Sequence, residues 1–203
     1  MSHYVITPPE GLPVTLEQAK AQCRVDIDIE DALVERLIRS AWQHAEHYQQ
    51  RTLLTCELGM TLHSFSSHES TRHGFSTDCF LPNGLIQLPY PPLQSITSIT
   101  YIDPNGQEQT LDPSAYEFEF NPGKGVIYPA YGHHWPATRC YRNSVTIRWI
   151  AGYDECPIET QSAILLMVGH LFEHREAVTE GTLIEVPMAV KDLLNVNCWG
   201  NYS

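Results

Sequence analysis

One stretch, from Cys156 to Glu176, constrains the fold more than any other part of this 203-residue chain. Pro157 suits the first turn of a helix, where its missing N–H is no loss, and apolar residues then cover nearly the whole circumference. A helix that is apolar all round is usually buried on most sides. Gly169 and His170 interrupt the stretch, and a bilayer span takes about 20 apolar residues. We therefore predict a central core helix.

Two helices are predicted near the N-terminus, after an extended segment over residues 1–14. The first begins at Thr15, because Thr15 and Gln18 have capping-box spacing, and it ends near Arg24. The second covers about residues 29–50, where apolar side chains recur at steps of three and four. Its apolar stripe comprises Ile29, Leu33, Leu37, Ala41, Ala45 and Tyr48, widened by Val34, Ile38 and Trp42.

Residues 52–152 follow a different period. Short apolar runs alternate with polar residues, and turn signals such as Asp103–Gly106 separate them, which is typical of antiparallel strands. Residues 64–78 are polar and aperiodic and are predicted to form a loop. After the central helix, a last short helix begins at Pro187. The predicted fold class is α+β, with a helical core from residues 1–51 and 153–203 and a small antiparallel β unit inserted at 52–152.

The charge balance limits the partners. A formal net charge of −12 argues against a protein that grips phosphate backbones, because such affinity comes from clustered Lys and Arg. An acidic surface can still line a passage through which DNA slides. The six cysteines occur singly, which favours buried thiols of a reducing compartment over a disulfide framework. The N-terminus has no signal-peptide pattern and no segment is predicted to cross a membrane, so we expect synthesis in the cytoplasm.

The end of the central helix carries a possible metal motif. His170, Glu173 and His174 spell H-x-x-E-H, which places both imidazoles on one helical face with a carboxylate beside them. A zinc-dependent hydrolase is therefore an alternative function, but it requires a third protein ligand and a larger fold. The downstream carboxylates available as that ligand are Glu180 and Glu185. We favour a polar helix end, where His suits the helix dipole.

A second histidine-rich stretch, YGHHWP, contains His133, His134 and Trp135. Adjacent histidines in an extended chain point to opposite sides and do not readily share one metal ion. Their possible co-ligands in the preceding loop are His63, His68 and His73. We favour a loop in which Trp135 plugs the β unit.

The order of motifs along about residues 14–195 resembles the head–tail connector (head-completion adaptor, or DNA-packaging) proteins of long-tailed bacteriophages and prophages. The resemblance begins in VTLEQAKAQCRVDIDIEDALVERLIRSAWQHAEHYQQRTL and continues through LPYPPLQSITSITYID, YGHHWP and VTIRWIAGY. It ends in the helix that closes with LFEHRE, followed by a Val-Pro and a short Leu-Leu helix. The residues over 63–79 depart most from the family pattern.

The resemblance implies a structural protein without enzymatic activity or cofactor. Such a protein forms a homo-oligomeric ring beneath the portal protein, extends the DNA channel and docks a tail-side completion protein. It can remain monomeric until the portal templates the ring. The DNA passes without specific binding, and no membrane is involved. The implied locations are the bacterial host cytoplasm during assembly and the virion head–tail junction.

Contact surfaces for this role are expected on the long helix and at the C-terminal end. We predict subunit or portal contacts by Ile38, Arg39, Trp42, Ala45, Leu193, Leu194 and Trp199. Two other classes remain open at this point: the zinc hydrolase, which predicts tightly held metal, and a generic cytoplasmic interaction module, which predicts neither metal nor ring.

Overall fold

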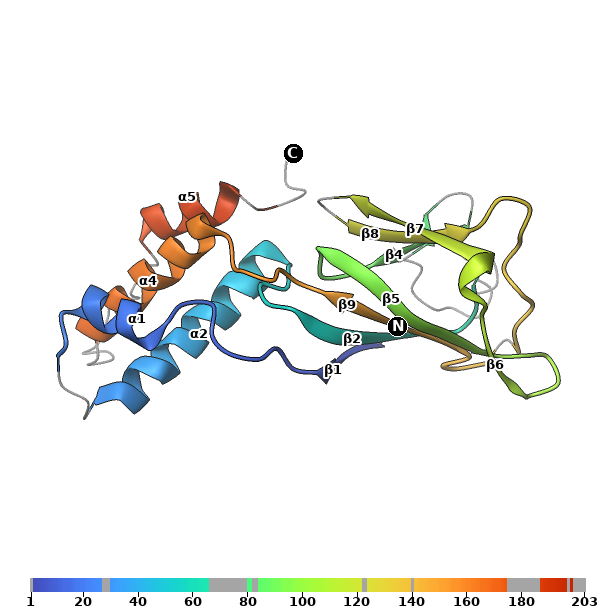
Figure 1. The fold of residues 1–203 in the computed structure, drawn as a ribbon, viewed down its shortest axis with the longest axis horizontal. Coiled ribbons are helices and arrows are strands. Elements are labelled where there is room, and N and C mark those ends of the chain that lie inside the picture. Colours follow the sequence, from blue (N-terminus) through green and yellow to red (C-terminus); the bar gives the residue numbers. More distant parts are fainter. Residues whose placement is uncertain are drawn as a thin grey trace, which may run out of the picture. The chain divides into compact units, whose positions relative to one another are not determined.

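The computed structural model describes residues 2–26, 30–65, 80–81, 84–121, 124–139, 141–174, 187–196 and 198. The chain divides into two compact units, which we call the β unit (Met1–Glu10 and Thr55–Gly152) and the helical unit (Gly11–Leu54 and Tyr153–Ser203). Both helices and antiparallel strands are present, so the predicted α+β class is confirmed (Figure 1).

Four α-helices build the helical unit: α1 (Leu16–Cys23), α2 (Asp31–Gln49), α4 (Ile158–Glu173) and α5 (Met188–Val196). The predicted capping box starts α1, because the Gln18 amide donates to Thr15 Oγ1 at 3.1 Å while the Thr15 amide donates to Gln18 Oε1 at 2.8 Å. Helix α2 ends at Gln50, which adopts a left-handed conformation with φ of 52°. Helix α4 packs against α1, α2 and α5, which confirms it as the central helix of this unit.

The buried stripe of α2 is narrower than the one predicted. Val34, Ile38 and Ala41 are buried, whereas Leu33 and Leu37 are only partly covered. The buried face combines Ala41 and Ala45 of the main predicted row with Val34, Ile38 and Trp42 of the row that widened it, where α2 packs against α4. Together with α1, α4 and α5, this stripe forms one apolar core.

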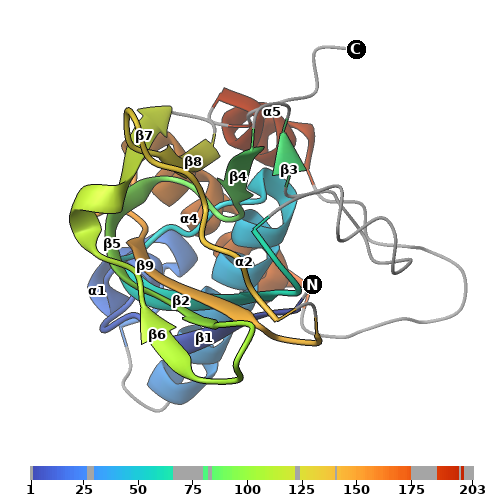
Figure 2. The ribbon, with the colours of Figure 1, turned by 90° about the vertical axis from the view of Figure 1, so that its right-hand side faces the viewer.

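Two sheets build the β unit. The first has the order β1-β2-β9-β5-β6, with β1 (Ser2–Thr7), β2 (Cys56–Leu62), β9 (Val145–Ala151), β5 (Leu93–Ile102) and β6 (Glu108–Thr110). The second has the order β3-β4-β8-β7, with β3 (Phe80–Leu81), β4 (Leu85–Leu88), β8 (Lys124–Pro129) and β7 (Tyr116–Asn121). A short 3-10 helix, η3 (Pro113–Ala115), precedes β7. Figure 2 shows the two sheets from the end of this unit.

The two sheets share a single apolar core. Inward residues of β2 and β9, including Met60, Ile147 and Trp149, pack with Ile86 and Ile127 from the second sheet. The sheets approach closely at Gly125, where an added Cβ would lie 2.8 Å from a Leu93 side-chain carbon. A side chain at this position would push the layers apart, so glycine is required there by space.

The predicted turn at Asp103–Gly106 joins β5 to β6. Asp103 Oδ1 accepts from the amides of Asn105 and Gln107, both at 2.9 Å, and Gly106 has a φ of 87°. An Asp side chain that bonds to the backbone ahead of it and a glycine with positive φ are common turn features. This hairpin was predicted from the sequence and is confirmed.

The N-terminal strand belongs to the β unit. Residues 1–51 were assigned to the helical core, but β1 pairs antiparallel with β2 and Met1–Glu10 cluster with the sheets. The prolines that mark this segment as extended are compatible with an edge strand, and only pairing over a long sequence distance shows which sheet it joins. Among the described residues, no helix has the length and apolar character needed to cross a membrane.

Candidate interaction surfaces

The predicted contact residues of α2 lie mostly inside the helical unit. Ile38 is fully buried, Trp42 and Ala45 are buried, and Leu194 of α5 is buried in the same core. A side chain that packs into its own core cannot also present surface to a partner. These four residues therefore have no exposed surface with which to form the predicted contacts.

The remaining predicted contact residues differ in exposure. Arg39 is exposed and forms an ion pair with Glu35 one turn earlier, with Nη2 and Oε1 2.7 Å apart. Leu193 is partly buried at the edge of the core. Trp199 lies outside the described residues. Of these residues, Arg39 is the one whose side chain is free to meet another molecule, at the cost of a weak surface ion pair.

Exposed apolar side chains on α4 and α5 were missed by the sequence analysis. Ile158 is 75% exposed and Leu166 is 39% exposed, although both were counted as part of a buried helix. Met188 and Val196 of α5 are also exposed. Helix α4 is apolar all round, but one face meets solvent and the other meets three helices. Composition alone therefore did not show which of its residues are exposed.

A buried polar contact fixes α5 to the rest of the helical unit. The Gln49 side chain, at the end of α2, donates to the Leu194 carbonyl at 2.8 Å and lies 3.4 Å from Thr160 Oγ1. The Tyr48 hydroxyl donates to Asn195 Oδ1 at 2.9 Å. Buried polar groups that find partners specify one arrangement, because any shift would leave them unsatisfied. The contact therefore sets the position of α5 on α2 and α4.

A second polar cluster lies where the chain leaves and re-enters the helical unit. Glu46 accepts a hydrogen bond from the Leu53 amide at 2.9 Å, and Arg51 donates to the Tyr153 hydroxyl. Burial raises the pKa of Glu46, and the Leu53 hydrogen bond opposes this shift. Burial, helped by the nearby charge of Glu46, raises the pKa of Cys156 to about 12. Cys156 is thus a protonated, unreactive thiol at neutral pH.

The histidines of the H-x-x-E-H motif lie together at the end of α4. The His170 and His174 rings are 4.5 Å apart, and His174 Nδ1 lies 2.9 Å from the His170 carbonyl oxygen. Glu173 is exposed, and the predicted third ligands, Glu180 and Glu185, lie outside the described residues. Within the described part of the chain, no three His, Cys, Asp or Glu side chains are grouped to hold a metal ion. The geometry gives the hydrolase alternative no support.

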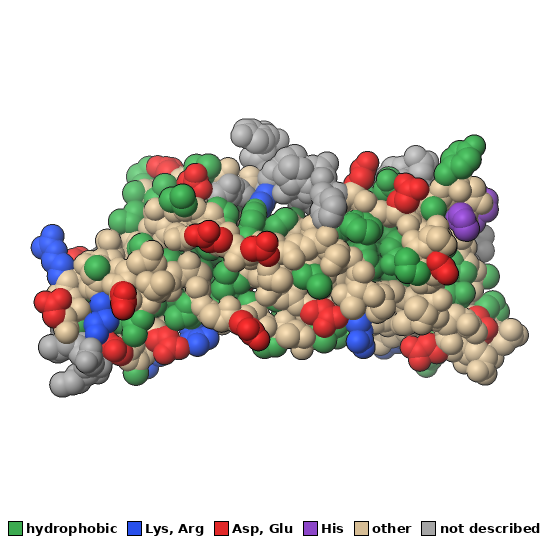
Figure 3. All heavy atoms as spheres, in the orientation of Figure 1, with side chains coloured by type: hydrophobic (Ala, Val, Ile, Leu, Met, Phe, Trp, Pro, Cys, Tyr) green, Lys and Arg blue, Asp and Glu red, His purple; other side chains and the backbone are tan. Residues whose placement is uncertain are grey.

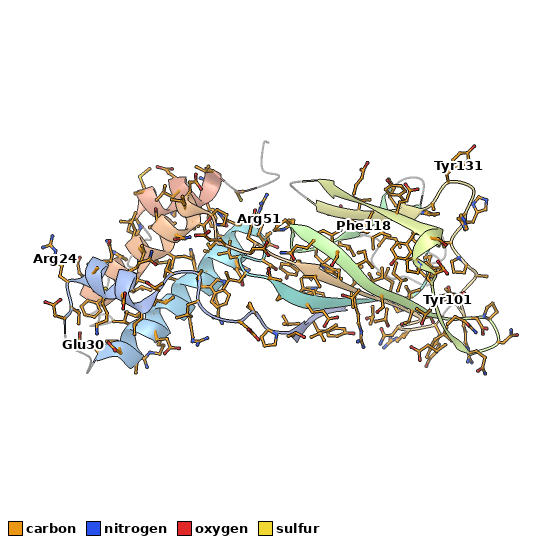
Figure 4. All side chains as sticks on the ribbon, in the orientation of Figure 1. Arg24, Glu30, Arg51, Tyr101, Phe118 and Tyr131 are labelled. Atoms are coloured by element: carbon orange, nitrogen blue, oxygen red, sulfur yellow. The ribbon has the colours of Figure 1, made fainter. Side chains whose placement is uncertain are left out.

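The histidine loop of the β unit is anchored by its tryptophan. Trp135 stacks on Phe65, with ring centroids 4.8 Å apart, and its indole N–H donates to the Gly84 carbonyl at 2.7 Å. The prediction that Trp135 plugs the β unit is confirmed. His133 and His134 are exposed, and Tyr131 points away from the β unit (Figure 4). His63 lies near the Tyr141 carbonyl, whereas His68 and His73 fall outside the described residues.

Acidic side chains are spread over the surface of both units, and no basic stripe is visible on the face shown in Figure 3. This distribution matches the formal net charge of −12. Binding of nucleic acid through phosphates needs clustered basic side chains, so this face is unsuited to it.

Comparison with protein families gives one match, to the phage gp6-like head-tail connector protein family over residues 13–109. This range contains α1, α2, β2 and β5, and thus parts of both units. A comparison with curated protein sequences finds no match.

Solved structures match almost the whole chain. A chain of the virion of a native gene transfer agent (GTA) particle is 16% identical, with a TM-score of 0.73 and coverage of 97% of this chain and 94% of that chain. A chain from the neck of an empty GTA particle, computed with C6 symmetry, is 19% identical, with a TM-score of 0.72 and coverage of 97% and 95%. A chain from the neck of a native GTA particle, computed with C12 symmetry, is 17% identical, with a TM-score of 0.63 and coverage of 95% and 94%.

At this level of identity the likeness establishes a shared fold, and that fold includes both units. None of these comparisons supports a hydrolase. The chain is therefore similar to the phage gp6-like head-tail connector family over residues 13–109, and it shares its fold with chains from GTA necks.

Proposed function

We propose that this chain assembles into a closed ring beneath the portal protein of a tailed phage or prophage particle, extends the DNA channel and docks a tail-side completion protein. The observation that carries the proposal is the shared fold with two neck chains, over 97% and 95% of this chain, combined with the match to the connector family model over residues 13–109. The necks of those particles were computed with C6 and C12 symmetry, and a cyclic assembly is what we propose here.

The acidic surface supports passage of DNA without binding. A channel wall that carried clustered Lys and Arg would hold the phosphates, whereas acidic groups repel them over about one Debye length, roughly 8 Å at physiological salt. The formal net charge of −12 disfavours adhesion of DNA to the protein surface. We expect assembly in the host cytoplasm and a final position at the head–tail junction.

A contact at Arg39 remains part of this proposal. Arg39 is exposed on α2, and its pairing with Glu35 across one helical turn is weak enough to exchange for a partner carboxylate. The buried residues beside it, Ile38 and Trp42, support the helix from within. In this arrangement the core side chains hold the shape of α2 and the exposed charges meet the neighbour.

The test is native mass spectrometry of the purified chain, alone and mixed with the portal protein of the same phage genome. We expect a closed oligomer of many subunits, at the latest when portal is present. Arg39→Glu should weaken the oligomer, whereas Arg148→Glu, an exposed reversal on β9, is the matched control for charge alone. If no oligomer and no portal complex form at any concentration, the ring proposal is wrong.

A further inference from the structure

Among the described strands, β1 has a neighbour on one side and an open edge on the other. It pairs with β2 on one side, over Ser2–Thr7, and it is the last strand of the sheet order β1-β2-β9-β5-β6. Every second backbone N–H and C=O of such a strand points away from its sheet and has no strand to bond to. An edge of this kind is a template for another strand.

This terminal strand is held firmly on its sheet. The His3 imidazole Nε2 lies 2.9 Å from the Tyr90 hydroxyl, and Thr7 Oγ1 donates to Glu57 at 3.3 Å. The Tyr4 ring lies over Gly59 so closely that a Cβ there would come within 2.8 Å of the ring. Chain termini are usually poorly ordered unless specific contacts tie them down.

The side chains of β1 remain largely exposed although the strand is ordered. Tyr4 is 41% exposed and Val5 is 57% exposed, and His3 and Thr7 are also exposed. In the described part of the chain, β1 therefore loses conformational freedom without covering much apolar surface. A pre-ordered edge lowers the entropy cost of a later association.

The other sheet edges are protected in ways that β1 is not. The edge strand β7 carries Glu117 and Glu119, both exposed. Strand β6 is three residues long and carries Glu108, and β3, the other edge of the second sheet, has two residues. Edge charges and short strands are common devices against unwanted pairing. Strand β1 has six residues, SHYVIT, and includes no Asp, Glu, Lys or Arg.

Charge and length together select the pairing partner. Two acidic edges placed side by side would bring like charges opposite one another, which is unfavourable, so β6 and β7 are poor partners for each other. The uncharged β1 avoids this repulsion. Strand β7 has six residues, as many as β1, whereas β6 has three.

Symmetry decides between two remaining arrangements. Pairing of β1 with β1 of another copy is isologous and stops at a dimer, whereas pairing of two different edges is heterologous and can continue into a ring. We propose that the free edge of β1 binds the β7 edge of a second copy of this chain. This inference rests on the proposed ring and names the surface that closes it.

A charge at Val5 tests the pairing directly. Val5→Glu should lower the association constant between subunits by about tenfold, because the introduced carboxylate would face the acidic β7 edge of the neighbour. Val5→Lys carries the opposite charge at the same exposed position and should keep or strengthen association. Thr97→Glu, exposed on β5, which has a neighbouring strand on both sides, is the matched control and should have no effect.

A compensating variant identifies the partner strand. Reversal of the acidic edge by Glu117→Lys with Glu119→Lys should restore association of Val5→Glu and weaken that of Val5→Lys. The readout is the oligomer distribution in native mass spectrometry with portal present, with far-UV circular dichroism to check the fold. In hydrogen exchange, amides of residues 2–7 should become protected when the ring forms.

The outcomes separate this inference from the proposed function. Rings that form equally well with Val5→Glu, or without added protection of residues 2–7, overturn the β1 edge while the connector ring stands. A Val5→Glu defect that the reversed β7 edge does not correct overturns β7 as the partner. Failure of the wild-type chain to form any ring overturns the proposed function and this inference with it.

Discussion

The helical unit and the β unit expose different kinds of surface. Each helix satisfies its backbone hydrogen bonds internally, so the helical unit meets a partner only through exposed side chains such as Arg39 or Ile158. The β unit ends in open strand edges and can also bind through its backbone. Side-chain patterns therefore describe the possible contacts of the helical unit, whereas contacts of the β unit depend on which strand lies at an edge.

The largest expected effect is on the core of the β unit. Trp149 lies on β9, which has a neighbour strand on both sides, and it is almost fully buried. Trp149→Ala should lower the free energy of unfolding by about 3–5 kcal/mol, since a large cavity would remain. Chemical denaturation with tryptophan-independent far-UV detection measures the change. Arg148→Ala, on the exposed face of the same strand, should change stability by less than about 0.5 kcal/mol.

A similar pair of substitutions tests the helical unit. Ile38→Ala should cost about 2–5 kcal/mol because Ile38 is fully buried, whereas Arg39→Ala should cost about 0.3–0.5 kcal/mol through loss of one exposed pair. Denaturant midpoints of both variants give the comparison. Equal effects would show that the outer face of α2 is as important to the monomer as the inner face, and our separation of core from contact residues would be wrong.

Replacement of a glycine by alanine is expected to have opposite effects on stability in the two units. Gly59→Ala should destabilise by no more than about 1 kcal/mol, because the new methyl group meets the far end of the partly exposed Tyr4 ring at 2.8 Å, and the ring has to move aside and loosen β1. Gly169→Ala, inside α4, meets only the Gln22 side chain at 3.5 Å and should stabilise by about 0.5–1 kcal/mol. Hydrogen exchange of residues 2–7 should rise in the first variant alone. Faster exchange there in Gly169→Ala would contradict the local origin of the effect.

The sequence analysis predicted the elements better than their surroundings. The capping box at Thr15, the turn at Asp103–Gly106 and the Trp135 plug depend on local chemistry, and all three were predictable. The pairing of β1 with β2 joins residues at least 50 positions apart, and no local pattern encodes it. This is why the N-terminal residues were placed with the wrong unit.

The contact residues were harder to predict for a related reason. The apolar stripes of α2 and α4 each extend beyond the width that one core can cover, and tertiary packing decides which side remains exposed. Ile38 and Trp42 were expected to meet a neighbour and are buried, whereas Ile158 was expected in the core and is exposed. Periodicity shows that a face is apolar, and the number of neighbouring helices shows which part of it is free.

The smallest predicted effect concerns the segment that links the units. Burial raises the pKa of Glu46, so the ionised carboxylate is less favourable in the folded chain than in the unfolded one. A raised carboxyl pKa means that the folded state binds the proton more tightly, and this contribution is lost as pH rises through the folded pKa. Glu46→Gln keeps an oxygen that can accept from the Leu53 amide but carries no charge. The variant should therefore be slightly more stable than the wild type at pH 7, and its advantage should shrink as pH falls through the raised pKa toward the ordinary value of 4.5.

Denaturation of both proteins across this pH range measures the difference, with Glu35→Gln on the exposed face of the same helix as control. A constant difference would mean that the Glu46 carboxylate is not desolvated. In that case the Leu53 amide would donate its hydrogen bond to a solvated carboxylate. The environment of Glu46 would then resemble the exposed surface of α2 and not its core.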